Sequence, residues 1–60
     1  MKITKDMLME AVYDLAEDIG RYLYEKGFDI DIPENITLQK ACEILQEDVE
    51  HIITGLYKLL

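Results

Sequence analysis

Apolar side chains recur at steps of three and four residues in two stretches of the chain, on either side of an irregular segment over residues 27–37. This spacing places them along one stripe of a helix, so both stretches are predicted to be helical. Further apolar residues widen each stripe, which indicates burial against more than one neighbour. The main stripes are Leu8, Val12, Leu15, Ile19 and Tyr22 before the segment, and Leu38, Cys42, Leu45, Val49, Ile52, Leu56 and Leu59 after it.

The same stripes fit two helical architectures. One is a hairpin of two long helices, about 4–26 and 38–59. The other breaks each half, because Asp14 and Asp48 are residue types that favour helix N-termini over helix interiors. Strong helix formers just before Asp48 favour continuity instead. Periodicity does not choose between the two.

Capping signals mark the ends of these stretches. Thr4 is expected to be the N-cap of the first helix and Thr37 that of the helix after the segment, since a hydroxyl can accept a hydrogen bond from a free amide. Gly27 is expected just past the end of the preceding helix, where positive φ is common. No tandem repeat is visible, so residues 1–60 are assigned to one small all-α domain.

Composition narrows the class of protein. Half of the 60 residues are hydrophobic, which favours a helical core or an interface between subunits over disorder. Cys42 is the only cysteine, so an internal disulfide is excluded and a cytoplasmic location is the simplest expectation. No apolar run approaches the ~20 residues that cross a bilayer, and the acidic, interrupted N-terminus is not expected to be a signal peptide.

The chain is acidic, with a formal net charge of −7. Residues 27–37 contain three acidic side chains and no basic one, so this segment is the most acidic per residue. The six basic residues are scattered, which argues against nucleic acid and against an anionic membrane, because both bind clustered Lys and Arg. The acidity suits solubility, a basic partner or mimicry of nucleic acid.

Four segments stand out by their order: ITKDM at residues 3–7, YLYEKGF at 22–28, TLQKACE at 37–43 and DVE at 48–50. Their order and spacing resemble the hybrid-cluster-protein-associated redox disulfide domain, and the related N-terminal domain of iron–sulfur cluster repair di-iron proteins. The resemblance covers roughly residues 3–59. It implies about four short helices, with breaks near residues 15–17 and 46–48. The implied helices lie near residues 5–14, 17–26, 38–45 and 49–59.

The resemblance implies a chemistry whose residues this chain lacks. The redox disulfide domain places a Cys-x-x-Cys pair just after the glycine that matches Gly27, and the repair-protein domain places adjacent cysteines there. The chain has Asp29, Ile30, Asp31 and Ile32 at these positions. A dithiol needs two sulfurs within bonding reach and a cluster needs several soft ligands, so neither is expected and no cofactor is predicted.

Two chemically capable side chains stand alone. Cys42 lies on an apolar stripe and is expected to be a small buried hydrophobe; the alternative is a reactive thiol acting between chains. His51 is expected on a helix surface, since no second histidine completes a metal pair. Serine is absent and no nucleophile–base pair is visible, so no catalytic residue is predicted.

The acidic side chains of the central segment have two interpretations. Asp29, Asp31, Glu34 and Asn35 form either a solvated turn or a cation site. An EF-hand loop would need glycine at its sixth position and glutamate at its twelfth, and the chain has neither there. The segment is therefore a poor match to such a loop, and no metal site is predicted.

The apolar residues of the same segment are the best candidates for binding. Phe28, Ile30 and Ile32 alternate with Asp29 and Asp31, as in a half-buried extended stretch that packs on the core or pairs with another chain. These five residues are the predicted contact site. Tyrosines off the main stripes are either scattered on the surface or part of an interface. They are Tyr13, Tyr24 and Tyr57.

These observations predict a non-catalytic, cytoplasmic binding or regulatory module, a relative of the redox disulfide domains without their cysteines. Its expected partner is another protein or a second copy of itself, and no small-molecule substrate is evident. One alternative is a redox- or metal-linked protein that uses Cys42 between chains. Another is an acidic inhibitor that mimics nucleic acid.

Overall fold

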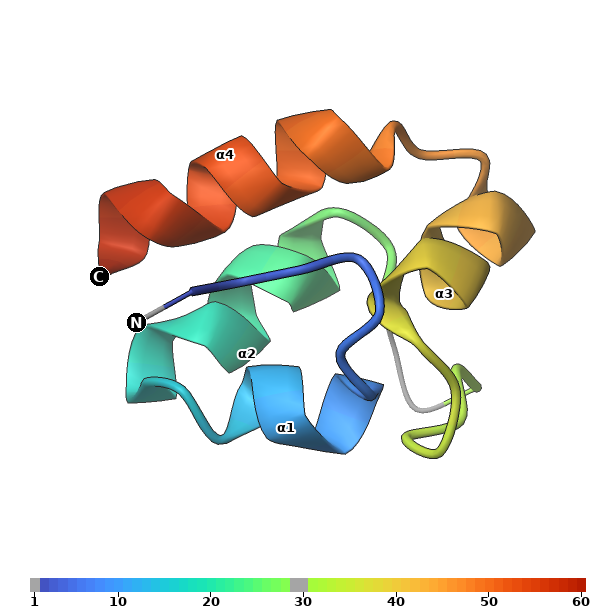
Figure 1. Ribbon diagram of the computed structural model, residues 1–60, viewed down its shortest axis with the longest axis horizontal. Coiled ribbons are helices and arrows are strands. Elements are labelled where there is room, and N and C mark those ends of the chain that lie inside the picture. The colour runs from blue at the N-terminus through green and yellow to red at the C-terminus, as the bar shows by residue number, and fades with distance from the viewer. Residues whose placement is uncertain (1, 29–30) are drawn as a thin grey trace.

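The computed structural model describes residues 2–28 and 31–60, and within them the chain forms four helices and no sheet (Figure 1). This confirms the all-α prediction. None of these four helices is both long and apolar enough to cross a membrane. The helices are α1 (Met9–Tyr13), α2 (Glu17–Glu25), α3 (Leu38–Leu45) and α4 (Val49–Leu59).

The second half of the chain has the caps that its sequence predicts. The Thr37 hydroxyl accepts a hydrogen bond from the Lys40 amide at 3.1 Å, and α3 starts there. The Asp48 carboxylate accepts one from the Glu50 amide at 3.0 Å, and α4 follows. Each cap satisfies an amide that has no partner inside the helix. Both helices coincide with the expected ranges 38–45 and 49–59.

The chain breaks into four helices rather than two. Gly27 ends α2 with φ +100°, as expected of a residue just past a helix. Gln46 ends α3 in the left-handed region with φ 59°, an uncommon conformation for a residue with a side chain. The two breaks lie at residues 14–16 and 46–48.

Two predicted caps in the first half are wrong. Thr4 lies in a turn, where its carbonyl accepts a hydrogen bond from the Met7 amide, and α1 begins only after Leu8, which provides no side-chain cap. Asp14 ends α1 instead of starting α2, which begins after Ala16. The first helix is therefore shorter than the predicted 5–14, because the chain before it is recruited into contact with the other half.

That contact is an antiparallel bridge between the residues that immediately precede α1 and α3. The Met9 amide donates to the Ile36 carbonyl, and the Leu38 amide donates to the Met7 carbonyl, each at 2.8 Å. Both helices start directly after this exchange. The N-terminal turns of α1 and α3 are thus fixed together by main-chain bonds between distant parts of the chain.

The bridge relates two structurally repeated segments, residues 3–12 and 32–41, although no tandem repeat is visible in the sequence. Both run through the same turn, bridge residue and helix start. Residues at equivalent positions are also buried alike, which makes the similarity one of packing as well as of path. The equivalent buried pairs are Ile3 and Ile32, Met9 and Leu38, and Val12 and Ala41.

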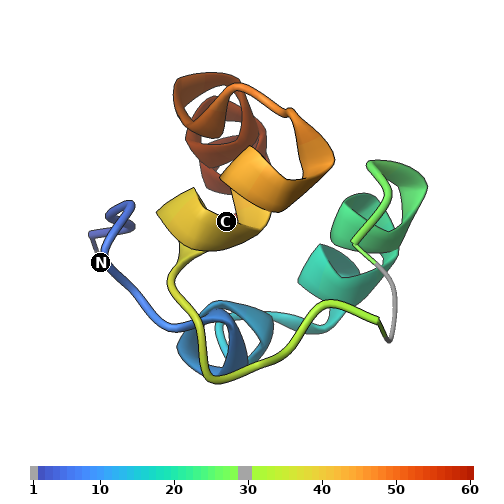
Figure 2. The same cartoon turned by 90° about the vertical axis from the view of Figure 1, so that its right-hand side faces the viewer.

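The four helices close around one core. α2 packs against α1 and α4, and α3 packs against the same two helices (Figures 1 and 2). The Tyr57 hydroxyl also accepts a hydrogen bond from the Ile3 amide at 2.8 Å and so ties the first described residues to α4. The largest fully buried side chains are Phe28, Met9, Ile19, Leu23, Leu38, Ile52, Leu56, Val12 and Cys42.

Candidate binding cleft

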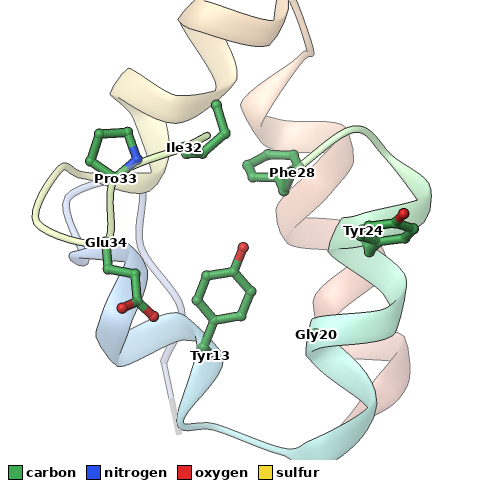
Figure 3. Close-up of a pocket in the computed structure, with 7 residues that line it drawn as sticks. All are labelled: Tyr13, Gly20, Tyr24, Phe28, Ile32, Pro33 and Glu34. Atoms are coloured by element: carbon green, nitrogen blue, oxygen red, sulfur yellow. The ribbon is translucent and has the colours of Figure 1, made fainter. Parts of the chain in front are cut away.

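A cleft of about 490 Å³ lies between α1, α2 and the segment that leads from α2 to α3. Figure 3 shows side chains from all three parts around it. We call it the α1–α2 cleft. Its lining residues are Tyr13, Gly20, Tyr24, Phe28, Ile32, Pro33 and Glu34.

Two buried residues of the segment hold the inner wall of this cleft. Phe28 is 2% exposed, and its amide donates to the Leu23 carbonyl at 2.9 Å, so its backbone is fixed to the end of α2 while its ring lies in the core. Ile32 is 8% exposed and belongs to the same core cluster. This side of the cleft is therefore preformed, which lowers the entropy lost when a ligand is ordered there.

Aromatic rings form the two sides. Tyr13 is the last residue of α1 and points into the space between the segment and α2 (Figure 3). Tyr24 stands on α2 across from it and is 69% exposed. Tyrosine combines a large apolar ring with a polar tip, which is why it is enriched at binding surfaces.

Glu34 is the only charged residue among the lining residues that the structure describes. Its carbonyl accepts a hydrogen bond from the Glu10 amide at 3.1 Å, which fixes this part of the segment against α1. Residues 10–34, which include both helices and the segment, carry eight acidic and two basic side chains, or −6 of the net −7. The stretch of chain that forms the cleft is thus strongly acidic.

Gly20 lies inside α2 and lines the cleft. Beyond its own helix, a Cβ built there would meet no atom of the described residues within 4 Å, so none of their packing contacts requires a glycine. Its φ is not positive, in contrast to that of Gly27, so the backbone does not require one either. Glycine inside a helix costs about 0.5–1 kcal/mol relative to alanine.

A second groove, of about 370 Å³, lies on the other side of α2, against α4. There the Tyr22 hydroxyl occupies the space where Gly55 lacks a side chain. The Lys26 ammonium lies 5.6 Å from the centre of the Tyr22 ring, within range of a cation–π contact. Lys26 caps the end of α2 and Lys58 lies in the last turn of α4, where cations offset the helix dipole.

Burial raises the pKa values of two side chains, Tyr22 in this second groove and Cys42 in the core. Burial first, and then electrostatic interaction with Glu47 and with Cys42, raise the pKa of Tyr22 above its ordinary value. Burial, followed by the charges of Glu47 and Asp48, raises the pKa of Cys42 to about 11. Cys42 is also 1% exposed, and a protonated, enclosed thiol is a poor nucleophile.

The structure separates the five predicted contact residues. Phe28 and Ile32 are buried and line the α1–α2 cleft with their outer edges, whereas Asp31 is exposed and does not line it. Asp29 and Ile30 lie outside the described residues. The interpretation of the segment as packed on the core thus holds for Phe28 and Ile32.

The other candidates also have defined places. His51 is exposed and lines the groove between α2 and α4, and Cys42 faces the core. Within residues 2–28 and 31–60, no three His, Cys, Asp or Glu side chains are grouped so as to hold a metal ion. Of the three tyrosines off the main stripes, Tyr13 and Tyr24 come together at the cleft, and Tyr57 is used to hold Ile3.

Comparison of the chain with models of protein families, with curated proteins and with solved structures gives no match. The function is therefore argued from the residues of this chain.

Proposed function

We propose that the chain is a non-catalytic protein-interaction module that holds an extended, basic segment of a partner protein in the α1–α2 cleft. The observation that carries this proposal is the cleft itself, which has a buried apolar wall and aromatic sides. Largely preformed, mostly apolar clefts with a few polar groups are typical of binding sites. The size of the cleft suits a few side chains of a peptide.

Charge supports the choice of a basic partner. The helices and segment around the cleft carry −6, and the lining residues include one carboxylate and no basic side chain among those described. Complementary charge speeds association and excludes acidic partners, and this contribution weakens as salt screens it. The proposed module thus selects basic over acidic partners by charge at long range, and selects among basic partners by shape inside the cleft.

The state of Cys42 favours a binding module over the redox alternative. A thiol that exchanges with another chain has to be accessible and at least partly ionised. Cys42 is buried, and its pKa of about 11 keeps it protonated at neutral pH. We therefore propose a cytoplasmic protein that resembles the redox disulfide domains but binds a protein without thiol chemistry.

Binding can be tested with short synthetic peptides of basic, neutral and acidic composition, titrated into isotope-labelled protein while amide resonances are followed by NMR. We expect basic peptides to shift resonances of the cleft saturably, and neutral or acidic peptides to bind more weakly. Gly20→Leu places a side chain in the cleft and should abolish the shifts. Ala11→Leu adds a similar side chain at an exposed position of α1 outside the cleft and should leave them unchanged.

Two results would refute the proposal. One is a set of peptides that binds equally well to the wild-type protein and to Gly20→Leu. The other is the absence of any saturable shift in the cleft with all three compositions. A sedimentation experiment on the same samples shows whether a second copy of the chain is the partner instead.

A further inference from the structure

Gly20 has no role in the fold that accounts for it. It lies inside α2, where alanine would favour the helix, and neither an atom of residues 2–28 and 31–60 nor a positive φ demands its lack of a side chain. Gly55 shows the contrast, because the Tyr22 hydroxyl fills the space beside it. A helix glycine without a structural partner is consistent with a ligand that approaches the backbone closely.

The groups around Gly20 define the chemistry of such a ligand. Tyr13 and Tyr24 offer aromatic faces, Phe28 and Ile32 offer apolar surface, and Glu34 offers one carboxylate. An aromatic face attracts a cation, and long basic side chains lay an apolar stem along such surfaces while the charge stays near an acceptor. A lysine or arginine side chain combines both parts.

We propose that the α1–α2 cleft binds one lysine or arginine side chain of a partner segment, with its stem against the backbone at Gly20 and its charge between the tyrosine rings and Glu34. The inference rests on the proposed function and specifies its ligand. Gly20 then acts as the specificity-determining residue, because any side chain at this position would occupy the space of the stem. The strongly acidic stretch of chain that forms the cleft adds to the attraction without selecting a position.

A matched set of peptides tests this assignment. The probes are acetyl-Ala-Ala-X-Ala-Ala-amide with X as lysine, arginine or norleucine, the last of which keeps the stem and removes the charge. We expect the lysine and arginine peptides to shift the resonances of Gly20 and Phe28 saturably. The norleucine peptide should bind roughly tenfold more weakly, as the loss of a cation–π contact and a charge pair would produce. The ratio of the two basic peptides identifies the preferred side chain.

Two variants locate the interaction. Glu34→Gln keeps the shape of the cleft and should reduce the difference between the lysine and norleucine peptides severalfold. Gly20→Ala adds one methyl group to open space and should weaken both basic peptides, while its thermal unfolding temperature is equal to or higher than that of the wild type. This pairing of weaker binding with retained folding excludes a loss of structure as the cause.

Each contrary outcome has a definite meaning. Equal binding of the norleucine and lysine peptides would overturn the cationic assignment and leave a peptide-binding cleft intact. Unchanged binding by Gly20→Ala would overturn the role of Gly20. Failure of all three probes, together with failure of the longer peptides, would refute the proposed function as well.

Discussion

The two grooves beside α2 differ in what fills them. On the α4 side, Tyr22 places its hydroxyl where Gly55 has no side chain, so the two helices meet closely. On the α1 side, Gly20 of the same helix leaves a similar space, which no atom from the described part of a neighbouring element enters. On one face, α2 therefore packs its Tyr22 against a glycine of α4, and we call this the closed contact. On its other face the space beside its own Gly20 stays open, and we call this the open contact.

Comparison of Gly55 with Gly20 shows which group is missing beside Gly20. Where a glycine serves the fold, the group that needs the space is present in the chain itself. Where that group is absent, the glycine lowers helix stability without any gain in packing. Such a loss of stability is expected where function needs the space, as we propose for the α1–α2 cleft.

The largest effect is expected at the closed contact. Gly55→Ala would force the Tyr22 ring away, so the free energy of unfolding should fall by about 1–3 kcal/mol despite the better helix propensity of alanine. Urea unfolding followed by circular dichroism measures it. In a Tyr22→Ala background the same substitution should be neutral or stabilising. An equal loss in both backgrounds would show that contact with Tyr22 is not its cause.

Alkaline pH should also lower stability, through the buried Cys42 of α3. Its raised pKa means that the folded protein keeps the thiol proton that the unfolded chain releases. The stability from this source is complete below pH 9.0 and is lost as pH rises to about 11. At ~1.4 kcal/mol per pKa unit, we expect a loss of roughly 1–3 kcal/mol. Cys42→Ala should have a shallower stability profile over this range, and identical profiles would contradict the assignment.

A tyrosine that holds the fold and one that lines the cleft should respond differently to loss of their hydroxyl. Tyr57→Phe leaves the partly buried Ile3 amide without its acceptor, so it should cost about 1 kcal/mol. Tyr24→Phe lies on the open side, is largely exposed, and should change stability by less than about 0.5 kcal/mol. Equal effects in denaturant unfolding would remove the distinction between tyrosines that hold the fold and tyrosines that line the cleft.

The effect at the open contact is expected to have the opposite sign. Gly20→Ala should raise the free energy of unfolding by about 0.5–1 kcal/mol, because it restores helix propensity in a place with room for a methyl group. The same unfolding measurement applies. A destabilised variant would mean that a neighbouring group enters the space in solution, and the cleft would then be closed like the other groove.

Local signals explain which elements the sequence could predict. α3 and α4 follow from their apolar stripes and from Thr37 and Asp48, whose caps involve amides only two or three residues away. The start of α1 could not be predicted in this way. It is set by the bridge to residues 36–38, a contact between distant segments that overrides the local preference of Thr4.

The site was predictable only in part. The tyrosines off the stripes pointed to Tyr13 and Tyr24, and the segment pointed to Phe28 and Ile32. Gly20 gave a weaker signal, because a single glycine within a helical pattern is commonly tolerated and only its three-dimensional surroundings show that nothing fills its place. A cleft formed by three segments depends on their mutual arrangement, which periodicity does not contain.

The bridge between the two repeated segments has a consequence for the order of folding. Because α1 and α3 share their first hydrogen bonds, neither helix can complete its start until a loop of the intervening chain has closed. Such a closure has an entropic cost before any local contact compensates for it. The amides of Met9 and Leu38 should therefore exchange with solvent only through global unfolding. The free energy of opening measured at these two amides should then equal the free energy of unfolding of the whole domain.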